Sequence, residues 1–265
     1  MTLRADGDLR AGEHLVGHDE VVMGTVFSFD VALGRGGARG ELHVALRHAC
    51  ALLHRLDALL SLWKPESAMS RYRSGALESL PCELTEVFER CAQAKAATDG
   101  WFDAEAMPGG MDPTGLVKGW AGQRALDILV GAGFPDAMVN AAGDVATSGG
   151  PGGPGRWRIG IQHPGSRAHL LGVAAVDGAI ATSGCYERGP HLYDPFERRL
   201  TSRFASATVT GPDLTLADAL ATALAVAGPT GFSFVERLAG YEAVAMAADG
   251  TTRQSSGWRF APVDV

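Results

Sequence analysis

The sequence predicts an α+β fold in which helices pack on a largely antiparallel sheet. Three observations favour this class: amphipathic helical segments, short strand-like segments joined by tight turns, and an order in which strands and helices do not alternate strictly. A Rossmann-like doubly wound sheet requires that alternation, because helices connect its parallel strands. We expect residues 1–19 to form a polar tail and residues 20–265 to form one domain.

Composition excludes several classes of protein. The chain has 265 residues, of which 46% are hydrophobic, so the material for a core is ample. Its net charge is −7 and it has no dense Lys/Arg run, which argues against nucleic-acid binding. We expect no transmembrane segment, because no apolar run reaches roughly 18 residues. The N-terminus has no secretory h-region or lipobox cysteine, which predicts a cytoplasmic location.

The cysteines and histidines show no familiar metal motif. There is no CxxC pair, and Cys82 and Cys91 are nine residues apart, which matches no zinc spacing. We therefore expect reduced thiols. His14 and His18 are four residues apart in the polar tail without a third ligand nearby, so we expect both to be solvated.

The first hundred residues read as one strand followed by helices. Residues 21–32 alternate from Thr25 onward, as a strand does, and residues 41–60 repeat leucines at helical spacing. Residues 67–72 suggest a short helical turn. A further helix is predicted from Thr85, as its N-cap, to Thr98.

The segment from Gly100 to Gly149 organises the chain. A loop carries Asp103 and Asp112, a helix begins near Gly115 and ends near residues 131–133, and a strand covers residues 137–141 before a glycine turn. This order directs backbone N–H groups and Lys118 toward an anion, most plausibly a phosphate. The alternatives are a solvated Lys118 and an Asp112 that only initiates a turn with Pro113.

The remainder combines several strands with two apolar helices. Asp177-Gly178 is a tight-hairpin signal between two strands, and Asp249-Gly250 could join another strand pair. The expected strands are residues 157–162, 170–176, 179–182, 204–210, 242–247 and 257–260, and the expected helices are residues 216–228 and 230–239.

Asp218 and Thr222 form the most informative pair. They are four residues apart in an almost wholly apolar helix, so they share one face and Asp218 should be buried. A carboxylate and a hydroxyl form a hard oxygen set that suits Mg²⁺ better than Zn²⁺. Alternatively, Asp218 accepts a loop N–H and Thr222 bonds back to its own helix.

Other candidates are weaker when taken singly. His191 lies in a polar loop, where it is either a general base or a structural residue. Trp63 and Met23 either line a flat aromatic ligand or belong to an ordinary core. Ser183 lacks the G-x-S-x-G context of a hydrolase nucleophile.

Taken together, the segments resemble the ApbE family of FAD:protein FMN transferases between Val21 and Gly228. The order and spacing of the motifs carry the resemblance, because each motif is weak by itself. They are residues 23–25, 60–67, 102–103, 112–121, 140–144, 181–184, 191–195 and 217–224.

The resemblance implies a T-fold-like core and a Mg²⁺-dependent transfer of FMN from FAD to a threonine of a target flavoprotein, with release of AMP. It implies that Asp218, Thr222 and the backbone carbonyl of Gly115 bind Mg²⁺. His191 would be the base, with Asp218 in the catalytic centre. The FAD contacts would be Met23, Trp63, Trp101, Phe102, Asp103, Asp112, Lys118 and Tyr193.

Three departures from the family pattern affect FAD affinity and the choice of acceptor. Gln123 stands where the family commonly has an acidic residue, Ala142 replaces the first glycine of a Gly-Gly-Asp turn, and the motif after Asp194-Pro195 differs. The alternative functions are an FAD pyrophosphatase that yields FMN and AMP, and a non-catalytic flavin-binding protein.

Overall fold

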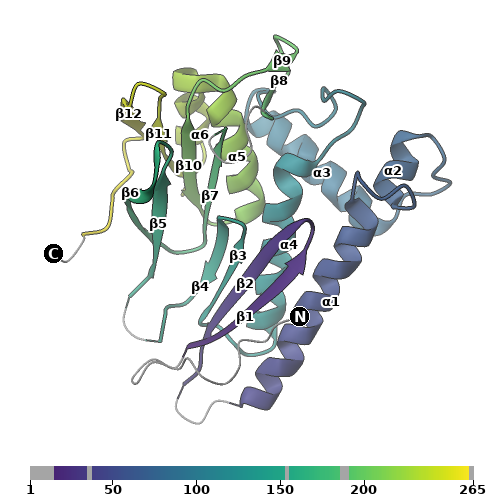
Figure 1. Ribbon diagram of the computed structural model, residues 1–265, viewed down its shortest axis with the longest axis vertical. Coiled ribbons are helices and arrows are strands. Elements are labelled where there is room, and N and C mark those ends of the chain that lie inside the picture. The colour runs from purple at the N-terminus through teal and green to yellow at the C-terminus, as the bar shows by residue number, and fades with distance from the viewer. Residues whose placement is uncertain (1–14, 35–37, 153–154, 186–190, 263–265) are drawn as a thin grey trace.

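The structure, a computed structural model, describes residues 15–34, 38–152, 155–185 and 191–262. Helices and strands follow one another in a mixed order, as Figure 1 shows. The helices are α1 (Arg39–Leu60), α2 (Ala68–Arg73), α3 (Cys82–Ala97), α4 (Thr114–Gly131), α5 (Leu214–Ala227), the 3₁₀ turn η1 (Gly228–Gly231) and α6 (Phe232–Glu236). The strands are β1 (Leu15–Val22), β2 (Thr25–Ala32), β3 (Ala137–Ala141), β4 (Asp144–Ser148), β5 (Trp157–His163), β6 (Ser166–Val176), β7 (Ala179–Gly184), β8 (Tyr193–Asp194), β9 (Arg199–Leu200), β10 (Ser206–Gly211), β11 (Glu242–Met246) and β12 (Thr252–Gln254).

One eight-stranded sheet forms the centre of the fold, with the order β1-β2-β3-β4-β7-β10-β11-β12. All the strand pairs described within it are antiparallel. The predicted α+β class is therefore confirmed. Because β7 lies next to β4 while β10 lies next to β7, the segments that follow α4 and precede α5 come together in the middle of the sheet.

Each face of the sheet is covered by different elements. Helices α4 and α5 pack on one face, and α1 lies beside α4 on the same face, against β1 (Figure 1). The β5–β6 hairpin covers part of the other face, where a small cluster includes Val145, Ile180 and Trp258. Burial of apolar surface in these two layers stabilises the fold by about 25 cal/mol per Å² removed from water.

The strand predicted over residues 21–32 is in fact the end of β1 and the whole of β2, which form a hairpin. Leu15–Val22 form β1 and pair with β2, so the expected tail is too long, and its residues 1–14 lie outside the described residues. Met23 and Gly24 make the turn between the strands with φ of 55° and 70°. His18 is 3% exposed in β1, so its prediction as a solvated residue is wrong, while His14 lies outside the described residues.

Three further predictions about local structure need correction. Helix α3 begins at Cys82, and Thr85 does not cap it but donates its hydroxyl to the Pro81 carbonyl. Asp177-Gly178 does not close a hairpin, because β6 pairs with β5 whereas β7 pairs with β4 and β10. The partner of β11 is β12, and residues 257–260 are not a strand.

Helices α4 and α5 approach each other closely at Gly119. A Cβ atom there would lie 2.6 Å from the Leu214 carbonyl oxygen and 2.8 Å from the Asp218 Cβ. Because Gly119 has no side chain, the N-terminal half of α4 can pack against the face of α5 that carries Asp218. The segment Leu214–Glu236 is long and apolar enough to span a membrane, but 78% of its most apolar window is buried inside this fold.

Candidate active site

A cavity of about 140 Å³ lies where the start of α4 meets α5, β7, β8 and the loop before α4. Ten predicted site residues line it. They are Trp101, Phe102, Asp103, Asp112, Gly115, Lys118, His191, Tyr193, Asp218 and Thr222.

A second cavity, of about 510 Å³, adjoins the first. Met23 and Trp63 line it, and Thr114 and Lys118 line both cavities. Trp63 is 91% exposed, which excludes the interpretation of this residue as ordinary core. The predicted site residues thus line two adjoining cavities, and Lys118 lines both of them.

Asp218 is buried and connects the two helices. Its Oδ2 accepts a hydrogen bond from the Gly119 N–H at 3.0 Å, and the side chain is 3% exposed. One turn further along α5, the Thr222 Oγ1 lies 2.9 Å from the Ser183 Oγ of β7. The alternative expectation of a loop N–H for Asp218 and a bond from Thr222 to its own helix is corrected, because the donor Gly119 lies in α4 and Thr222 contacts Ser183.

The oxygen atoms around this point fit a small hard cation. Asp218 supplies a carboxylate, Thr222 and Ser183 supply hydroxyls, and all three residues line the cavity. A Cβ atom on Gly115 would come within 3.6 Å of the Thr222 Oγ1 and would fill space beside these oxygens. Mg²⁺ prefers such oxygen ligands, so the residues present suit it.

Lys118 is oriented by a buried acidic residue from the glycine turn. Its Nζ lies 2.7 Å from Asp144 Oδ2, and Asp144 Oδ1 accepts the Thr182 N–H at 3.1 Å. Asp144 is 2% exposed. The ammonium group is therefore held at the wall of both cavities by a carboxylate that is fixed to the central sheet.

The loop before α4 is tied down by its two aspartates. Asp103 accepts the Glu105 N–H at 3.0 Å and lies 2.8 Å from the Lys95 ammonium. Asp112 accepts the Thr114 N–H at 3.0 Å, as expected for a turn-initiating residue, and it also lines the cavity. Both carboxylates therefore shape the cavity wall.

Aromatic rings close another side of this wall. Trp101 packs edge-on against Phe196 with ring centroids 4.8 Å apart, and the Arg203 guanidinium lies 5.2 Å from the Trp101 ring. Tyr193 in β8 is half-buried and faces the same cavity. His191 is exposed and also lines the cavity, so its ring is reachable from solvent.

Asp194 anchors the segment that carries His191 and Tyr193. Burial would raise the pKa of this carboxyl, but N–H groups of Glu197 and Phe196 and the Arg203 guanidinium together lower the pKa below its ordinary value. Arg203 Nη1 lies 3.0 Å from Asp194 Oδ2. The charged form of Asp194 thus holds the β8–β9 turn on the body of the protein.

Gln123 is not among the residues that line the two cavities. Its Oε1 accepts the Leu214 N–H at 3.2 Å and its Nε2 donates to Asp127 Oδ1 at 3.1 Å. The amide therefore accepts a backbone N–H from the first turn of α5.

Sequence reasoning missed two contributors to the site. Asp144 belongs to the motif of residues 140–144, but the sequence pattern predicts no role for this residue. A single acidic residue between a glycine turn and apolar strand residues nevertheless indicates a buried ion pair. Ser183 was discounted as a hydrolase nucleophile, and the structure instead pairs its hydroxyl with Thr222.

Comparison with known proteins finds one family model and several similar proteins. The model of the ApbE family matches residues 23–110 and 105–245. A protein named FAD:protein FMN transferase from Rhodobacter capsulatus is 33% identical over 148 residues, or 52% of this chain. One of the same name from Vibrio cholerae serotype O1 is 33% identical over 129 residues, or 44% of this chain. The matches span 28% and 39% of those relatives' own lengths.

Solved structures share the fold over nearly the whole chain. The flavin transferase ApbE from Vibrio cholerae has a TM-score of 0.78 at 19% identity, covering 92% of this chain and 98% of its own. The apo flavinyl transferase ApbE from Pseudomonas stutzeri has a TM-score of 0.79 at 23% identity, covering 92% and 95%. The apbe protein from Thermotoga maritima gives 0.78 at 21% identity, covering 91% and 97%.

Proposed function

The chain belongs to the ApbE family, and from this premise we propose that it is a Mg²⁺-dependent FAD:protein FMN transferase. It would move FMN from FAD to a threonine of an acceptor flavoprotein and release AMP. The observation that carries the proposal is the convergence of Asp218, Thr222 and Lys118 on one cavity. A carboxylate, a hydroxyl and an ammonium group at one wall suit a cation and a pyrophosphate together.

The two cavities suit a dinucleotide better than a mononucleotide. They adjoin at Thr114 and Lys118. With its pyrophosphate beside Lys118, FAD could therefore place one half in each cavity. Trp63 and Met23 offer apolar surface in the larger hollow, and Trp101, Phe102 and Tyr193 offer aromatic surface in the smaller one. Asp103 and Asp112 would accept hydrogen bonds from ligand hydroxyl or amine groups.

In the reaction, the acceptor threonine Oγ would attack the phosphorus atom of the FMN half. A new phosphorus–oxygen bond forms, the anhydride bond to the AMP phosphate breaks, and AMP leaves with the bridging oxygen. A ring nitrogen of His191 would take the hydroxyl proton, for which its exposed position at the cavity is suitable. Lys118 would hold negative charge on the phosphoryl oxygens, and Asp144 would keep its ammonium in place.

Asp218, Thr222 and the Gly115 carbonyl would hold Mg²⁺, which when bound supplies charge neutralisation at the pyrophosphate. Gly119 keeps Asp218 in position through its N–H. Ser183 orients the Thr222 hydroxyl by hydrogen bonding to it. These contacts would fix the ligand oxygens before a substrate binds.

One observation favours FAD hydrolysis as a second candidate function. The His191 side chain is exposed, so water can reach the proposed base when no acceptor protein covers it. The products would then be FMN and AMP, from the same residues with water as nucleophile.

The test incubates the full chain with FAD, Mg²⁺ and a threonine-bearing acceptor flavoprotein, followed by a denaturing gel and analysis of released AMP. Transfer predicts fluorescent acceptor protein and an equal amount of AMP. Hydrolysis predicts free FMN and AMP without fluorescent protein. FAD binding without AMP in any condition would contradict both and identify a non-catalytic flavin-binding protein.

A further inference from the structure

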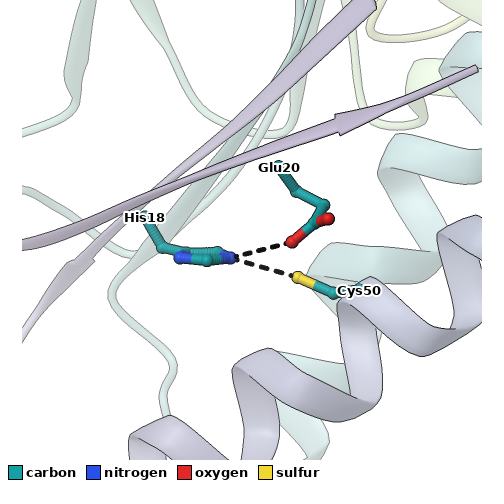
Figure 2. Close-up of side chains that lie close together, drawn as sticks. All are labelled: His18, Glu20 and Cys50. Atoms are coloured by element: carbon teal, nitrogen blue, oxygen red, sulfur yellow. Dashed lines mark hydrogen bonds and ion pairs between the residues drawn. The ribbon is translucent and has the colours of Figure 1, made fainter. Parts of the chain in front are cut away.

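A second cluster of chemically versatile side chains lies between β1 and α1, among residues that line neither active-site cavity. His18 and Glu20 are two residues apart in β1 and therefore point to the same face of the strand. Cys50 and His54 are four residues apart in α1 and share one helix face. Figure 2 shows the His18 ring, the Glu20 carboxylate and the Cys50 sulfur directed toward one another.

The polar atoms of the cluster converge closely. His18 Nε2 lies 3.3 Å from Glu20 Oε2 and 3.3 Å from Cys50 Sγ (Figure 2). His54 Nε2 lies 2.8 Å from the other carboxylate oxygen, Glu20 Oε1. From standard zinc–ligand bond lengths, tetrahedral nitrogen, oxygen and sulfur ligands lie about 3.4 to 3.6 Å apart. The His18, Glu20 and Cys50 atoms are thus spaced nearly as ligands of one ion.

Hydrogen bonds join the three side chains but leave one ring nitrogen of His18 over. The Glu20 carboxylate is hydrogen-bonded to both the His18 ring and the Cys50 thiol, and His18 Nε2 also lies against the Cys50 sulfur. The other ring nitrogen, His18 Nδ1, is buried without a hydrogen-bond partner in the described part of the chain. His18, Glu20 and Cys50 are 3%, 7% and 9% exposed, so water does not readily compensate.

We propose that His18, Glu20 and Cys50 bind one divalent cation of the zinc class. Imidazole, thiolate and carboxylate together are the donors that Zn²⁺ takes, whereas Mg²⁺ and Ca²⁺ prefer oxygen alone. His54 would orient the Glu20 carboxylate through its other oxygen, and its side chain, which is 55% exposed, marks the solvent side of the cluster. The ion would link the N-terminal strand to the longest helix, so its role is structural.

A reactive thiol is a weaker interpretation of the same cluster. Cys50 is buried between β1 and α1, with 9% of its surface exposed. A redox-active or nucleophilic cysteine needs exposure to its reaction partner. Cys50 lacks that exposure.

Cobalt serves as a spectroscopic probe for this site. The full chain, freed of metal by chelator and kept reduced, is titrated with Co²⁺, because a thiolate–cobalt bond gives a charge-transfer band in the near ultraviolet. We expect this band to saturate at one ion per chain, and added Zn²⁺ should remove it. Cys50→Ser should abolish the band, while the matched control Cys91→Ser, a buried thiol outside the cluster, should retain it.

Two further variants keep the test independent of folding and of the active site. His54→Ala alters a half-exposed side chain and should weaken Zn²⁺ binding by about 10–100-fold, the loss typical of a residue that orients a metal ligand. Asp218→Ala should retain the cobalt band, because its site offers oxygen donors. Absence of the band in the unmodified chain, or its persistence in Cys50→Ser, would overturn the proposal.

Discussion

Lys118 and Asp144 form an ion pair between Nζ and Oδ2 at 2.7 Å, although 26 residues separate them in the chain. The carboxylate is buried and is also fixed by the Thr182 N–H, so the pair joins α4 to the centre of the sheet. Lys118 stands between the two cavities. This relationship connects the stability of the fold with the phosphate contact that the proposed reaction needs.

Lys118→Gln should lower the rate of FMN transfer by about 10²-fold, because one preorganised charge at the phosphoryl oxygens is lost. It should also destabilise the protein, since it leaves Asp144 buried without its cation. The double variant Lys118→Gln, Asp144→Asn separates the two effects. Thermal unfolding should recover in the double variant while the rate stays low; a recovered rate would remove Lys118 from the mechanism.

Gly119→Ala should destabilise the protein by about 1–3 kcal/mol, because the added methyl group meets the Leu214 carbonyl and Asp218. It should also reduce activity, since Asp218 must move. The matched control is Gly131→Ala at the other end of α4, where a Cβ meets nothing within 4 Å. That variant should be neutral or stabilising by up to about 1 kcal/mol. Denaturant unfolding of both proteins measures the difference, and equal effects would contradict the packing argument.

Asp194 should make stability depend on pH on the acid side. Its folded pKa lies below the ordinary value, so its contribution is present above that ordinary value and is lost as pH falls through the folded pKa. Asp194→Asn should cost roughly 1–3 kcal/mol at neutral pH, because charged hydrogen bonds are lost. The difference in free energy of unfolding between the unmodified chain and Asp194→Asn should become smaller in acid. A difference that grows as pH falls would contradict the lowered folded-state pKa of Asp194.

Trp63→Ala should raise the KM for FAD without a change in thermal stability, because the ring is 91% exposed yet lines the larger cavity. Exposed substitutions usually change stability by no more than about 0.5 kcal/mol. Leu80→Ala, at another exposed apolar residue outside both cavities, is the control and should leave KM unchanged. An unchanged KM in Trp63→Ala would exclude this ring from FAD binding.

Local signals predicted most of the elements that build the site. The strand Ala137–Ala141 has the bounds expected from its apolar run, and α4 begins beside the expected Gly115 and ends at the expected Gly131. Spacing alone placed Asp218 and Thr222 on one face of α5, and both line the cavity. Such patterns depend on residues close together in the chain, which a single sequence displays directly.

Contacts between distant segments could not be predicted in the same way. The Asp177-Gly178 turn has hairpin chemistry, but turn residues do not specify which strands then pair, and β6 and β7 pair with different neighbours. The sequence predicted His18 to be a solvated tail residue, because its burial depends on packing against α1. Its neighbour in that helix, Cys50, lies 32 residues away in the chain. Hydrogen bonds and ion pairs across the fold require the topology to be known.

In the proposed reaction, Asp218, Thr222 and Gly115 hold the metal ion beside the pyrophosphate that Lys118 contacts. This arrangement can be tested by anomalous diffraction from crystals of the full chain soaked with FAD and Mn²⁺, a scattering substitute for Mg²⁺. We expect one manganese peak within bonding distance of the Asp218 carboxylate and the Thr222 hydroxyl, with the FAD phosphates next to Lys118. Manganese bound elsewhere, or FAD whose phosphates lie away from Lys118, would contradict it.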